Sequence, residues 1–310
     1  MWENTHENVA RRFRDAVGEE FVLEREPMSS HTTFRVGGPA DFFLRPADAG
    51  ELAAAVSVCR EEGIPFFVMG NGSNLLVADK GFEGAVISTN RLSAMAAERT
   101  PEGGVIRAQA GAMLSKIAKV ALDNGLTGFE FAAGIPGSLG GAVVMNAGAY
   151  GGEMRDVIRH VTVLTPDGGI LKRTPEELAM GYRTSLVAVQ ELTVLEAEIF
   201  LETGDPEAIR ARMEELSAMR REKQPLQYPS AGSTFKRPAG YFAGKLIDDA
   251  GLRGFSVGGA QVSEKHCGFV VNRGGATAAD IMELCRLVSE RVKKESGVAL
   301  ELEIRTVGRF

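Results

Sequence analysis

Two glycine-rich segments carry the side chains whose types and spacing could bind a ligand. The first runs from Val68 to Asp79 and the second from Ala133 to Tyr150. Glycine has no Cβ atom, so the backbone amides of such segments can approach a diphosphate closely. The two segments together indicate a dinucleotide held from two sides, although glycines of this kind also mark ordinary turns. Short hydrogen-bonding side chains stand between the glycines: Asn71, Ser73, Asn74, Ser138 and Asn146.

The first segment does not match the Rossmann dinucleotide fingerprint. Its run from Gly70 to Leu75 lacks the third glycine, and no acidic residue follows about 20 positions later in a clear strand. The sequence therefore indicates a nucleotide site of another kind.

Three short polar clusters could supply reacting groups. They are centred on Tyr182-Arg183, on Ser233 to Arg237, and on Glu301 to Arg305. In the last cluster, strand alternation would place the two glutamates and the arginine on one face. Each cluster alone has an ordinary explanation: a surface charge at Arg183, a turn residue at Ser233, and a weak exposed ion pair between Glu303 and Arg305.

The bulk composition excludes several classes of partner. The chain has 310 residues, enough for two or three lobes, and 41 acidic against 35 basic residues give a net charge of −6. We therefore expect no nucleic-acid partner. The longest apolar run, residues 129–145, is broken by glycines and a proline, so we expect no membrane span. The polar first residues contain no signal-peptide core, which favours a cytoplasmic protein.

Cysteine and histidine usage argues against a metal or disulfide framework. The three cysteines are scattered and form no Cys-x-x-Cys pair. The four histidines have no ligand spacing, so we expect no metal site. We assign no role to Cys267 or to the neighbouring His266.

Helix and strand periodicities alternate along the chain and predict an α+β fold. We expect an amphipathic helix at 3–17, followed by a strand at 41–45, a helix capped by Asp48, and a strand at 64–69. Further on, we expect a strand at 105–110, a helix from Leu114, and a hairpin that turns at Asp167-Gly168.

The rest of the chain, from Thr174 onward, shows equally clear signals. Thr174 and Glu177 have capping-box spacing for a helix, and residues 192–201 predict a buried strand. A charged connector helix begins at Asp205. We then expect a strand at 267–272, a helix capped by Thr277 and Asp280, and a final strand at 298–307.

Six segments, in the same order along the chain, carry a resemblance to a known family. The set closely resembles the UDP-N-acetylenolpyruvoylglucosamine reductases over residues from about 28 to 309. Arg183 and Ser233 lie only 50 positions apart, without an inserted tyrosine-bearing loop, so the chain is similar to the shorter branch of that family. The segments are Thr32–Asp41, Gly70–Asp79, Gly134–Gly141, Tyr182-Arg183, Ala231–Lys236 and Glu301–Gly308.

The resemblance implies an FAD-binding fold of the vanillyl-alcohol-oxidase type with an additional substrate domain. On that basis we expect an N-terminal helix and lead-in at 1–27, FAD-binding subdomains at 28–100 and 101–204, and a connector helix with the substrate-binding domain at 205–310. The implied reaction is the reduction of UDP-N-acetylglucosamine enolpyruvate to UDP-N-acetylmuramate with NADPH, in bacterial peptidoglycan synthesis. We expect noncovalent FAD and a monomer.

Residue roles follow from the match to the family motifs. Ser233 would donate a proton, while Arg183 and Glu303 would act at the enolpyruvyl carboxylate. The implied FAD contacts are Gly70, Asn71, Gly72, Ser73, Asn74, Gly134, Ile135, Pro136, Gly137, Ser138, Gly140, Gly141 and Asn146. The implied substrate contacts are Tyr182, Lys236, Arg237, Lys245 and Asn272, each of which could instead be loop polarity or packing.

The residue types suit that chemistry. An arginine offers a permanently charged fork for a carboxylate on which negative charge builds up. A serine hydroxyl is a poor acid and needs nearby cations, for which Lys236, Arg237 and Lys245 are available. Glu303 must be protonated or tightly hydrogen-bonded, because a bare carboxylate there would repel the developing charge.

Two other readings remain open at this point. A flavin oxidase or dehydrogenase of the same fold could act on a hydroxy acid or alcohol. Many such enzymes tether FAD through a histidine, and neither glycine segment contains one. A binding module could also hold FAD or a UDP-sugar without turnover. A bound flavin that bleaches with NADPH and recovers with substrate would distinguish an enzyme from a binder.

Overall fold

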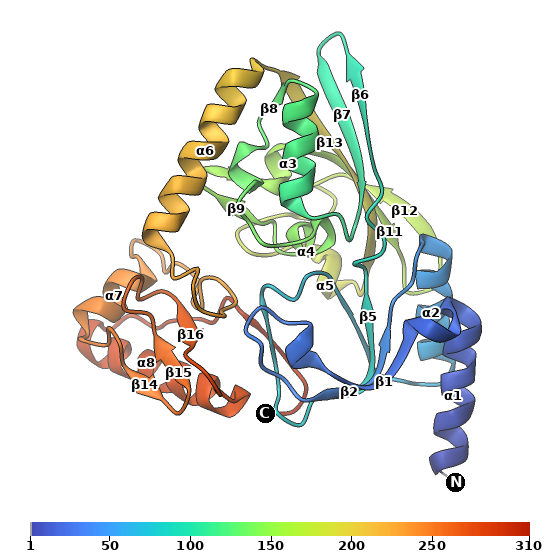
Figure 1. Cartoon of the computed structure of the whole chain (residues 1–310), viewed down its shortest axis with the longest axis horizontal. Coiled ribbons are helices and arrows are strands. Elements are labelled where there is room, and N and C mark those ends of the chain that lie inside the picture. Colours follow the sequence, from blue (N-terminus) through green and yellow to red (C-terminus); the bar gives the residue numbers. More distant parts are fainter. Residues whose placement is uncertain (1) are drawn as a thin grey trace. The chain divides into compact units, whose positions relative to one another are not determined.

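The computed structural model describes the backbone of residues 2–310 and the side chains from His6 onward (Figure 1). The chain separates into two units, each built from segments that are not consecutive. Unit 1 holds the residues up to Glu24, then Phe42–Asn71 and Gly84–Arg220. Unit 2 holds Arg25–Asp41, Gly72–Glu83 and Arg221–Phe310.

A six-stranded antiparallel sheet forms the centre of unit 1. Five of its strands lie in the order β12-β11-β13-β7-β6, and β8 pairs with the end of β13. Alternate residues of β13 are buried, as expected for a strand with one face on a core. The strands are β6 (Met95–Thr100), β7 (Gly103–Gln109), β8 (Leu126–Thr127), β11 (Ile158–Leu164), β12 (Ile170–Arg173) and β13 (Thr193–Thr203).

Helix α3 (Leu114–Asp123) buries its apolar stripe in the same core as that sheet. Ile117, Ala118 and Ala121 recur at helical spacing on this stripe, which is why the segment folds as a helix rather than a strand. The predicted hairpin with its Asp167-Gly168 turn is confirmed by the antiparallel pairing of β11 with β12. The predicted strand at 192–201 is confirmed as β13.

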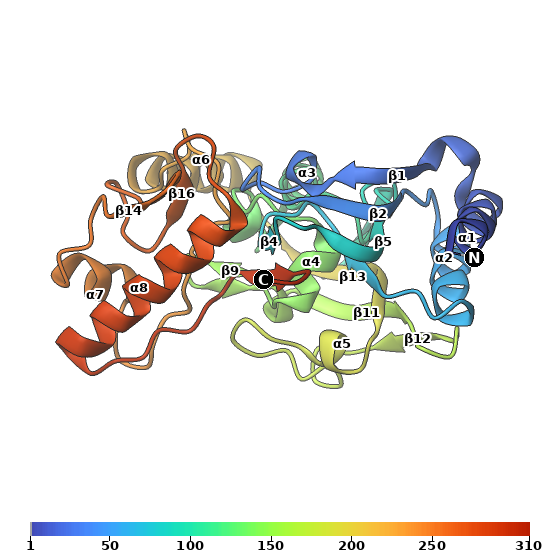
Figure 2. The same ribbon diagram turned by 90° about the horizontal axis from the view of Figure 1, so that it is seen from below.

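The N-terminal helix α1 (Trp2–Val17) lies beside α2 (Ala49–Glu61) in both ribbon views (Figures 1 and 2). Val9, Phe13 and Val17 form its buried stripe, so the predicted amphipathic helix is confirmed. The predicted cap of α2 is also confirmed, because Asp48 accepts a hydrogen bond from the Glu51 amide at 2.9 Å.

A second sheet has the strand order β1-β2-β5-β3, with β3 and β5 parallel. Its strands are β1 (Val22–Pro27), β2 (Pro39–Leu44), β3 (Phe66–Met69) and β5 (Phe82–Ser88). The remaining elements up to the end of the connector are the helices α4 (Leu139–Val144), α5 (Leu186–Val189) and α6 (Pro206–Lys223), and the short strands β9 (Gly148–Ala149) and β10 (Gly152–Glu153).

In unit 2 the long helix α8 (Ala278–Ser296) packs on a small antiparallel sheet (Figure 2). Its buried residues Ile281, Leu284, Val288 and Val292 have helical spacing. The sheet consists of β14 (Ser256–Val257), β15 (Ala260–Val262) and β16 (Val270–Asn272), and α7 (Ala243–Asp249) packs against α8. A parallel pair, β4 (Leu75–Val77) with β17 (Arg305–Val307), completes this unit.

Helix α8 has an N-terminus capped from two places. Thr277 accepts from the Asp280 amide at 3.0 Å, which confirms the predicted capping box. The amides of Ala278 and Ala279 donate to the two carboxylate oxygens of Asp79, at 2.7 and 3.0 Å. Asp79, the last residue of the first glycine segment, therefore serves as a helix cap supplied from about 200 positions away.

We expect Asp79→Ala to destabilise the protein by about 1–2 kcal/mol, the usual cost of removing a helix cap. The change leaves two backbone amides at the start of α8 without their acceptors. Asp79→Asn, which keeps one acceptor oxygen, should cost less, and Lys80→Ala next to it should cost nothing measurable. Urea unfolding of the full chain checks the series; equal stability of Asp79→Ala and wild type would contradict it.

Three predicted elements differ from the structure, and one is the strand expected at 267–272, of which only Val270–Asn272 forms β16. Thr174 and Glu177 make both capping-box hydrogen bonds, at 2.8 and 3.3 Å, but the predicted helix is wrong. The chain makes one turn there and leaves it at Ala179, whose φ is +43°. The predicted strand at 298–307 is too long: only Arg305–Val307 forms a strand, which pairs with β4, and Leu302 makes a single bridge to Phe235.

No helix within residues 2–310 combines the length and the apolar character that a membrane crossing requires.

Candidate active site

The two glycine segments approach each other within unit 1. The Asn71 side chain donates to the Pro136 carbonyl oxygen at 2.7 Å. A Cβ atom on Gly70 would overlap the Ser138 hydroxyl unless that side chain moved, so the two residues are in close contact. Residues 70–71 of the first segment thus lie against the second segment.

The second segment offers features that fit FAD. The Ser138 hydroxyl is buried and has no hydrogen-bond partner among the described residues. Buried hydroxyls are normally paired, so an acceptor or donor from a ligand would satisfy it. Gly141 has open space where a side chain would stand, since the atom nearest to a Cβ at this position would be the Ser138 hydroxyl oxygen, at 4.0 Å. Exposed glycine backbone next to an unsatisfied hydroxyl suits a ligand with many polar oxygens.

Arg183 lies on a tight turn in unit 1. Gly181 and Thr184 exchange two backbone hydrogen bonds, at 3.0 and 3.2 Å, which leaves Tyr182 and Arg183 at the tip. Arg183 has a φ of +56°, a conformation that non-glycine residues seldom adopt and that recurs at functional sites. Its guanidinium donates to the Gly148 carbonyl oxygen at 3.2 Å, and its Cζ lies 5.1 Å from the centre of the Tyr182 ring.

Ser233 and Glu303 are brought together within unit 2. The Glu303 amide donates to the carbonyl oxygen of Thr234 at 2.8 Å, and Phe235 pairs with Leu302 in an antiparallel bridge. Ser233 is exposed, whereas the neighbouring Thr234 is fully buried. The proposed proton donor and the proposed carboxyl group therefore stand on neighbouring segments of the same unit.

The first glycine segment also supports Glu303. The Asn74 side chain donates to the Glu303 carbonyl oxygen at 3.1 Å, and the Arg305 amide donates to the Asn74 carbonyl oxygen at 2.9 Å. The main chain of Glu303 is thus held on one side by Thr234 and on the other by Asn74. Burial follows the predicted alternation only in part: Ile304 is buried and Glu301 is exposed, but Leu302 and Glu303 are both partly buried.

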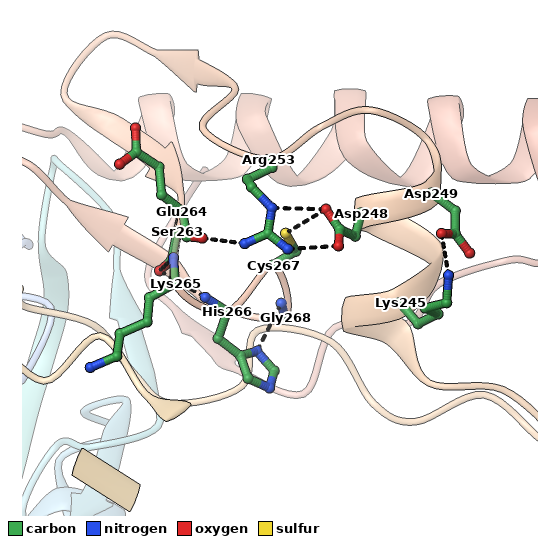
Figure 3. Close-up of polar contacts among 10 residues, drawn as sticks. All are labelled: Lys245, Asp248, Asp249, Arg253, Ser263, Glu264, Lys265, His266, Cys267 and Gly268. Carbon is green, nitrogen blue, oxygen red and sulfur yellow. Dashed lines mark hydrogen bonds and ion pairs between the residues drawn. The ribbon is translucent and has the colours of Figure 1, made fainter. Parts of the chain in front are cut away.

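The cations near Ser233 in sequence have partners of their own. Lys236 pairs with Glu301 at 3.2 Å, and the Arg237 guanidinium lies 3.9 Å from the centre of the Phe242 ring. Lys245, on α7, is exposed and pairs with Asp249, which raises the pKa of this lysine (Figure 3).

Asn272 makes its contacts inside unit 2. Its Nδ2 donates to the Phe34 carbonyl oxygen at 3.1 Å, and its Oδ1 accepts from the amides of Gly274 and Ala276 at 2.9 and 3.2 Å. The residue is buried, so these contacts hold the loop that leads into α8.

Cys267 and His266 belong to a structural cluster (Figure 3). The Cys267 thiol donates to Asp248 at 3.5 Å, and Arg253 binds the same carboxylate through two nitrogens, at 2.9 and 2.6 Å. Burial raises the pKa of Cys267 to about 11, which keeps it a thiol at neutral pH. Burial also lowers the pKa of His266, and its Nδ1 accepts from the Gly268 amide at 3.1 Å. Neither side chain is prepared for nucleophilic or acid chemistry.

One cation beside the glycine segments escaped the sequence reasoning. Arg220, near the end of α6, donates to the carbonyl oxygen of Gly134. Burial lowers the pKa of this guanidinium, and Tyr150 opposes that shift. The sequence offered no local signal for this contact, because the two residues are 86 positions apart.

Comparisons with known proteins agree with this arrangement. Residues 40–174 match the domain family described as "FAD binding domain", and residues 224–307 match "UDP-N-acetylenolpyruvoylglucosamine reductase, C-terminal domain". The chain is 51% identical over 291 residues to the UDP-N-acetylenolpyruvoylglucosamine reductase of Clostridium perfringens, covering 94% of each protein.

Solved structures show the same relationship. The crystal structure of UDP-N-acetylenolpyruvylglucosamine reductase (MurB) from Thermus caldophilus superposes with a TM-score of 0.77 at 37% identity, covering 93% of this chain and 98% of that one. Phl p 4.0202, a glucose dehydrogenase, shares only the fold, with a TM-score of 0.51 at 12% identity over 64% of this chain and 44% of its own. The predicted α+β FAD-binding fold is therefore confirmed.

A match to the C-terminal domain alone would leave the activity open, but here identity above one half extends over nearly the whole chain and includes the FAD-binding domain. The protein is accordingly an FAD-dependent oxidoreductase that belongs to the UDP-N-acetylenolpyruvoylglucosamine reductase family.

Proposed function

We propose that this enzyme reduces UDP-N-acetylglucosamine enolpyruvate to UDP-N-acetylmuramate with NADPH, in the cytoplasmic synthesis of peptidoglycan precursors. The observation that carries the proposal is the pairing of the Ser233 segment with the Glu303 segment through the Glu303 amide and the Thr234 carbonyl oxygen. The segments that carry the Ser233 hydroxyl and the Glu303 carboxyl group are thereby neighbours, and the two groups are proposed to act on one reacting carbon. The names of the relatives support the choice of substrate.

FAD, when bound, would supply the hydride chemistry that links NADPH to C3 of the enolpyruvyl group. The proposed cofactor contacts are the glycine-segment residues 70–74, 134–138, 140 and 141; the side chain of Asn146, also expected from the sequence to contact FAD, makes its hydrogen bonds to protein atoms instead. Among these residues, the Ser138 hydroxyl gives the strongest support for a bound ligand, because it is buried and has no hydrogen-bond partner among the described residues.

Arg183 is proposed to bind the enolpyruvyl carboxylate. Negative charge grows on that carboxylate as hydride reaches C3, and a guanidinium fork stabilises it without losing its own proton. The strained φ of Arg183 is consistent with a side chain fixed for this task. Tyr182, half exposed at the same tip, is a proposed neighbour of the substrate.

Ser233 is proposed to donate the proton that C2 receives. Its exposed position allows a substrate to reach the hydroxyl. Glu303 is proposed to act beside it, protonated or hydrogen-bonded, so that no second bare carboxylate faces the growing charge. Lys236 and Arg237 follow Ser233 in the chain. Together with Lys245 and Asn272 they are proposed to contact the substrate.

An anaerobic titration tests the proposal. NADPH should bleach the bound flavin, and the enolpyruvyl nucleotide should then restore its colour while one UDP-N-acetylmuramate forms per flavin. A flavin that bleaches but is not reoxidised by this nucleotide would overturn the proposed substrate. A flavin that NADPH leaves unchanged would overturn the proposed reductant.

We expect Gly141→Leu to weaken FAD binding at least tenfold without unfolding the protein. Leucine is a good helix former and Gly141 lies in α4 with open space at its Cβ position, so the fold accepts the side chain. The same side chain would fill space that the cofactor needs. Reversible titration of the apoprotein with FAD measures the affinity and also tests that the cofactor is noncovalent. Unchanged affinity would place FAD away from this glycine.

A further inference from the structure

Asn146 follows α4 in the second glycine segment and is completely buried. Its φ is +40°, which asparagine tolerates better than most residues. The sequence marked it as a cofactor contact, yet its side chain already has three protein partners. Nδ2 donates to Glu153 Oε2 at 2.9 Å and to the Gly181 carbonyl oxygen at 3.1 Å, and Oδ1 accepts from the Arg155 amide at 2.9 Å.

Both amide hydrogens of Asn146 are therefore donated to protein oxygens. One of these oxygens, that of Gly181, belongs to the first residue of the turn that carries Arg183. The other belongs to Glu153, which also pairs with Arg155 and is thereby held in place. A buried side chain with both donors committed has no N–H left for a cofactor.

Two further contacts tie the same turn to the same segment. The Ser185 hydroxyl donates to the Val144 carbonyl oxygen at 2.8 Å, and Arg183 Nη2 donates to the Gly148 carbonyl oxygen at 3.2 Å. Asn146 stands between Val144 and Gly148 in sequence, and its partner Gly181 is the first residue of the turn. Of the three contacts, only that of Asn146 is made by a buried amide side chain. It holds the Gly181 carbonyl oxygen, which also accepts the Thr184 amide hydrogen bond that closes the turn.

Arg183 adopts a sparsely populated backbone conformation, which persists only where the surroundings hold it. We propose that Asn146 is a positioning residue that holds the Arg183 turn in its strained conformation through the Gly181 carbonyl oxygen, and so aims the guanidinium at the substrate carboxylate. That the Arg183 guanidinium faces the substrate carboxylate rests on the proposed function. That Asn146 holds the turn in place does not depend on the proposed function, because all of these contacts are between protein atoms.

Three variants separate this role from a general effect on the fold. Asn146→Asp keeps the acceptor for the Arg155 amide but cannot donate, and it sets two carboxylates face to face. Adding Glu153→Gln restores a hydrogen bond between positions 146 and 153, while the Gly181 oxygen still lacks the side-chain donor that Asn146 provides in wild type. Glu153→Gln alone is the matched control, since Asn146 can still donate to the glutamine oxygen and to Gly181.

Amide hydrogen exchange tests the hold on the turn without reference to catalysis. In Asn146→Asp/Glu153→Gln, the amides of Gly181 and Thr184 should exchange at least tenfold faster than in wild type. Amides of β13 should exchange at the wild-type rate, and Glu153→Gln should match wild type throughout. Unchanged exchange at Gly181 and Thr184 in the double variant would overturn the proposal, whether or not the enzyme reduces the enolpyruvyl nucleotide.

Single-turnover kinetics test the aim of the guanidinium. The double variant should reoxidise its flavin with the enolpyruvyl nucleotide about 10- to 100-fold more slowly, as expected for a displaced catalytic group, and bind FAD with wild-type affinity. In an Arg183→Lys background the same two changes should slow that step less than about threefold, because residues that act through one group are not additive. Additive losses, or a loss of FAD affinity, would assign Asn146 a role apart from Arg183.

These readouts keep the two proposals distinct. If wild type fails to reduce the enolpyruvyl nucleotide while the turn exchanges faster in the double variant, the proposed function falls and the hold on the turn stands. If wild type reduces it and the turn exchanges normally in the double variant, the proposed function stands and the positioning role falls.

Discussion

Ser233→Ala should reduce its flavin with NADPH at close to the wild-type rate but reoxidise it with the enolpyruvyl nucleotide about 10²- to 10⁴-fold more slowly, the usual cost of losing a positioned general acid. The first half of the cycle needs no proton at C2 of any substrate. The second half does, and Ser233 is the proposed donor. Stopped-flow absorbance of the flavin follows each half separately.

The contacts around Ser233 indicate that Ser233→Ala leaves the backbone of its segment in place. Ser233 is exposed, and the segment keeps its place through Thr234, whose hydroxyl accepts from the Val270 amide at 2.9 Å and whose carbonyl oxygen accepts from Glu303. Ser256→Ala, an exposed serine in the same unit, is the matched control and should leave both halves intact. Equal slowing of both halves would indicate damage to the flavin site, and a normal second half would remove Ser233 from the mechanism.

Arg183→Lys and Glu303→Gln should each lower turnover by about 10²- to 10³-fold, the range seen when one stabilising donor is removed from a developing negative charge. Lysine keeps the charge of Arg183 but loses the two-pronged geometry, and glutamine removes the acidic proton of Glu303. Thermal unfolding should remain close to wild type. Steady-state kinetics with both substrates measure the losses.

Two conservative changes elsewhere serve as controls for that pair. Arg159→Lys lies in the same unit as Arg183, with its guanidinium over the Phe200 ring, and Glu290→Gln lies on α8 in the same unit as Glu303. Both should turn over normally. Should Arg183→Lys and Glu303→Gln also turn over normally, the two charges are surface features and the proposed site is wrong.

Structural features that depend on residues close together in the chain could be predicted from the sequence. Asp48, Thr277 and the Asp167-Gly168 turn were predicted correctly, because a cap or a tight turn is decided by neighbours in the chain. Thr174 and Glu177 show the limit of such signals: the local hydrogen bonds form, but the left-handed Ala179 ends the segment after one turn.

Contacts between distant segments could not be predicted in this way. The final strand is short because its length depends on β4, and nothing in residues 298–307 reports where that partner ends. Asp79 and Asn146 were placed in ligand segments on composition, while the structure pairs them with α8 and with the Arg183 turn. Periodicity gave no reason to group Arg183, Ser233 and Glu303, and the proposal that they act in one reaction comes from the family resemblance.

The hydrogen bond from Asn74 to Glu303 also constrains how the protein can be made. Its two residues lie 229 positions apart, and β4 pairs with β17, a strand that is synthesised much later. At ribosomal rates of about 5–20 residues per second, β4 waits roughly 10–50 s for its partner. Unit 2 therefore cannot complete its fold before residues 305–307 have been synthesised, and a change that disrupts β17 leaves this early strand without the partner that it has in the folded enzyme.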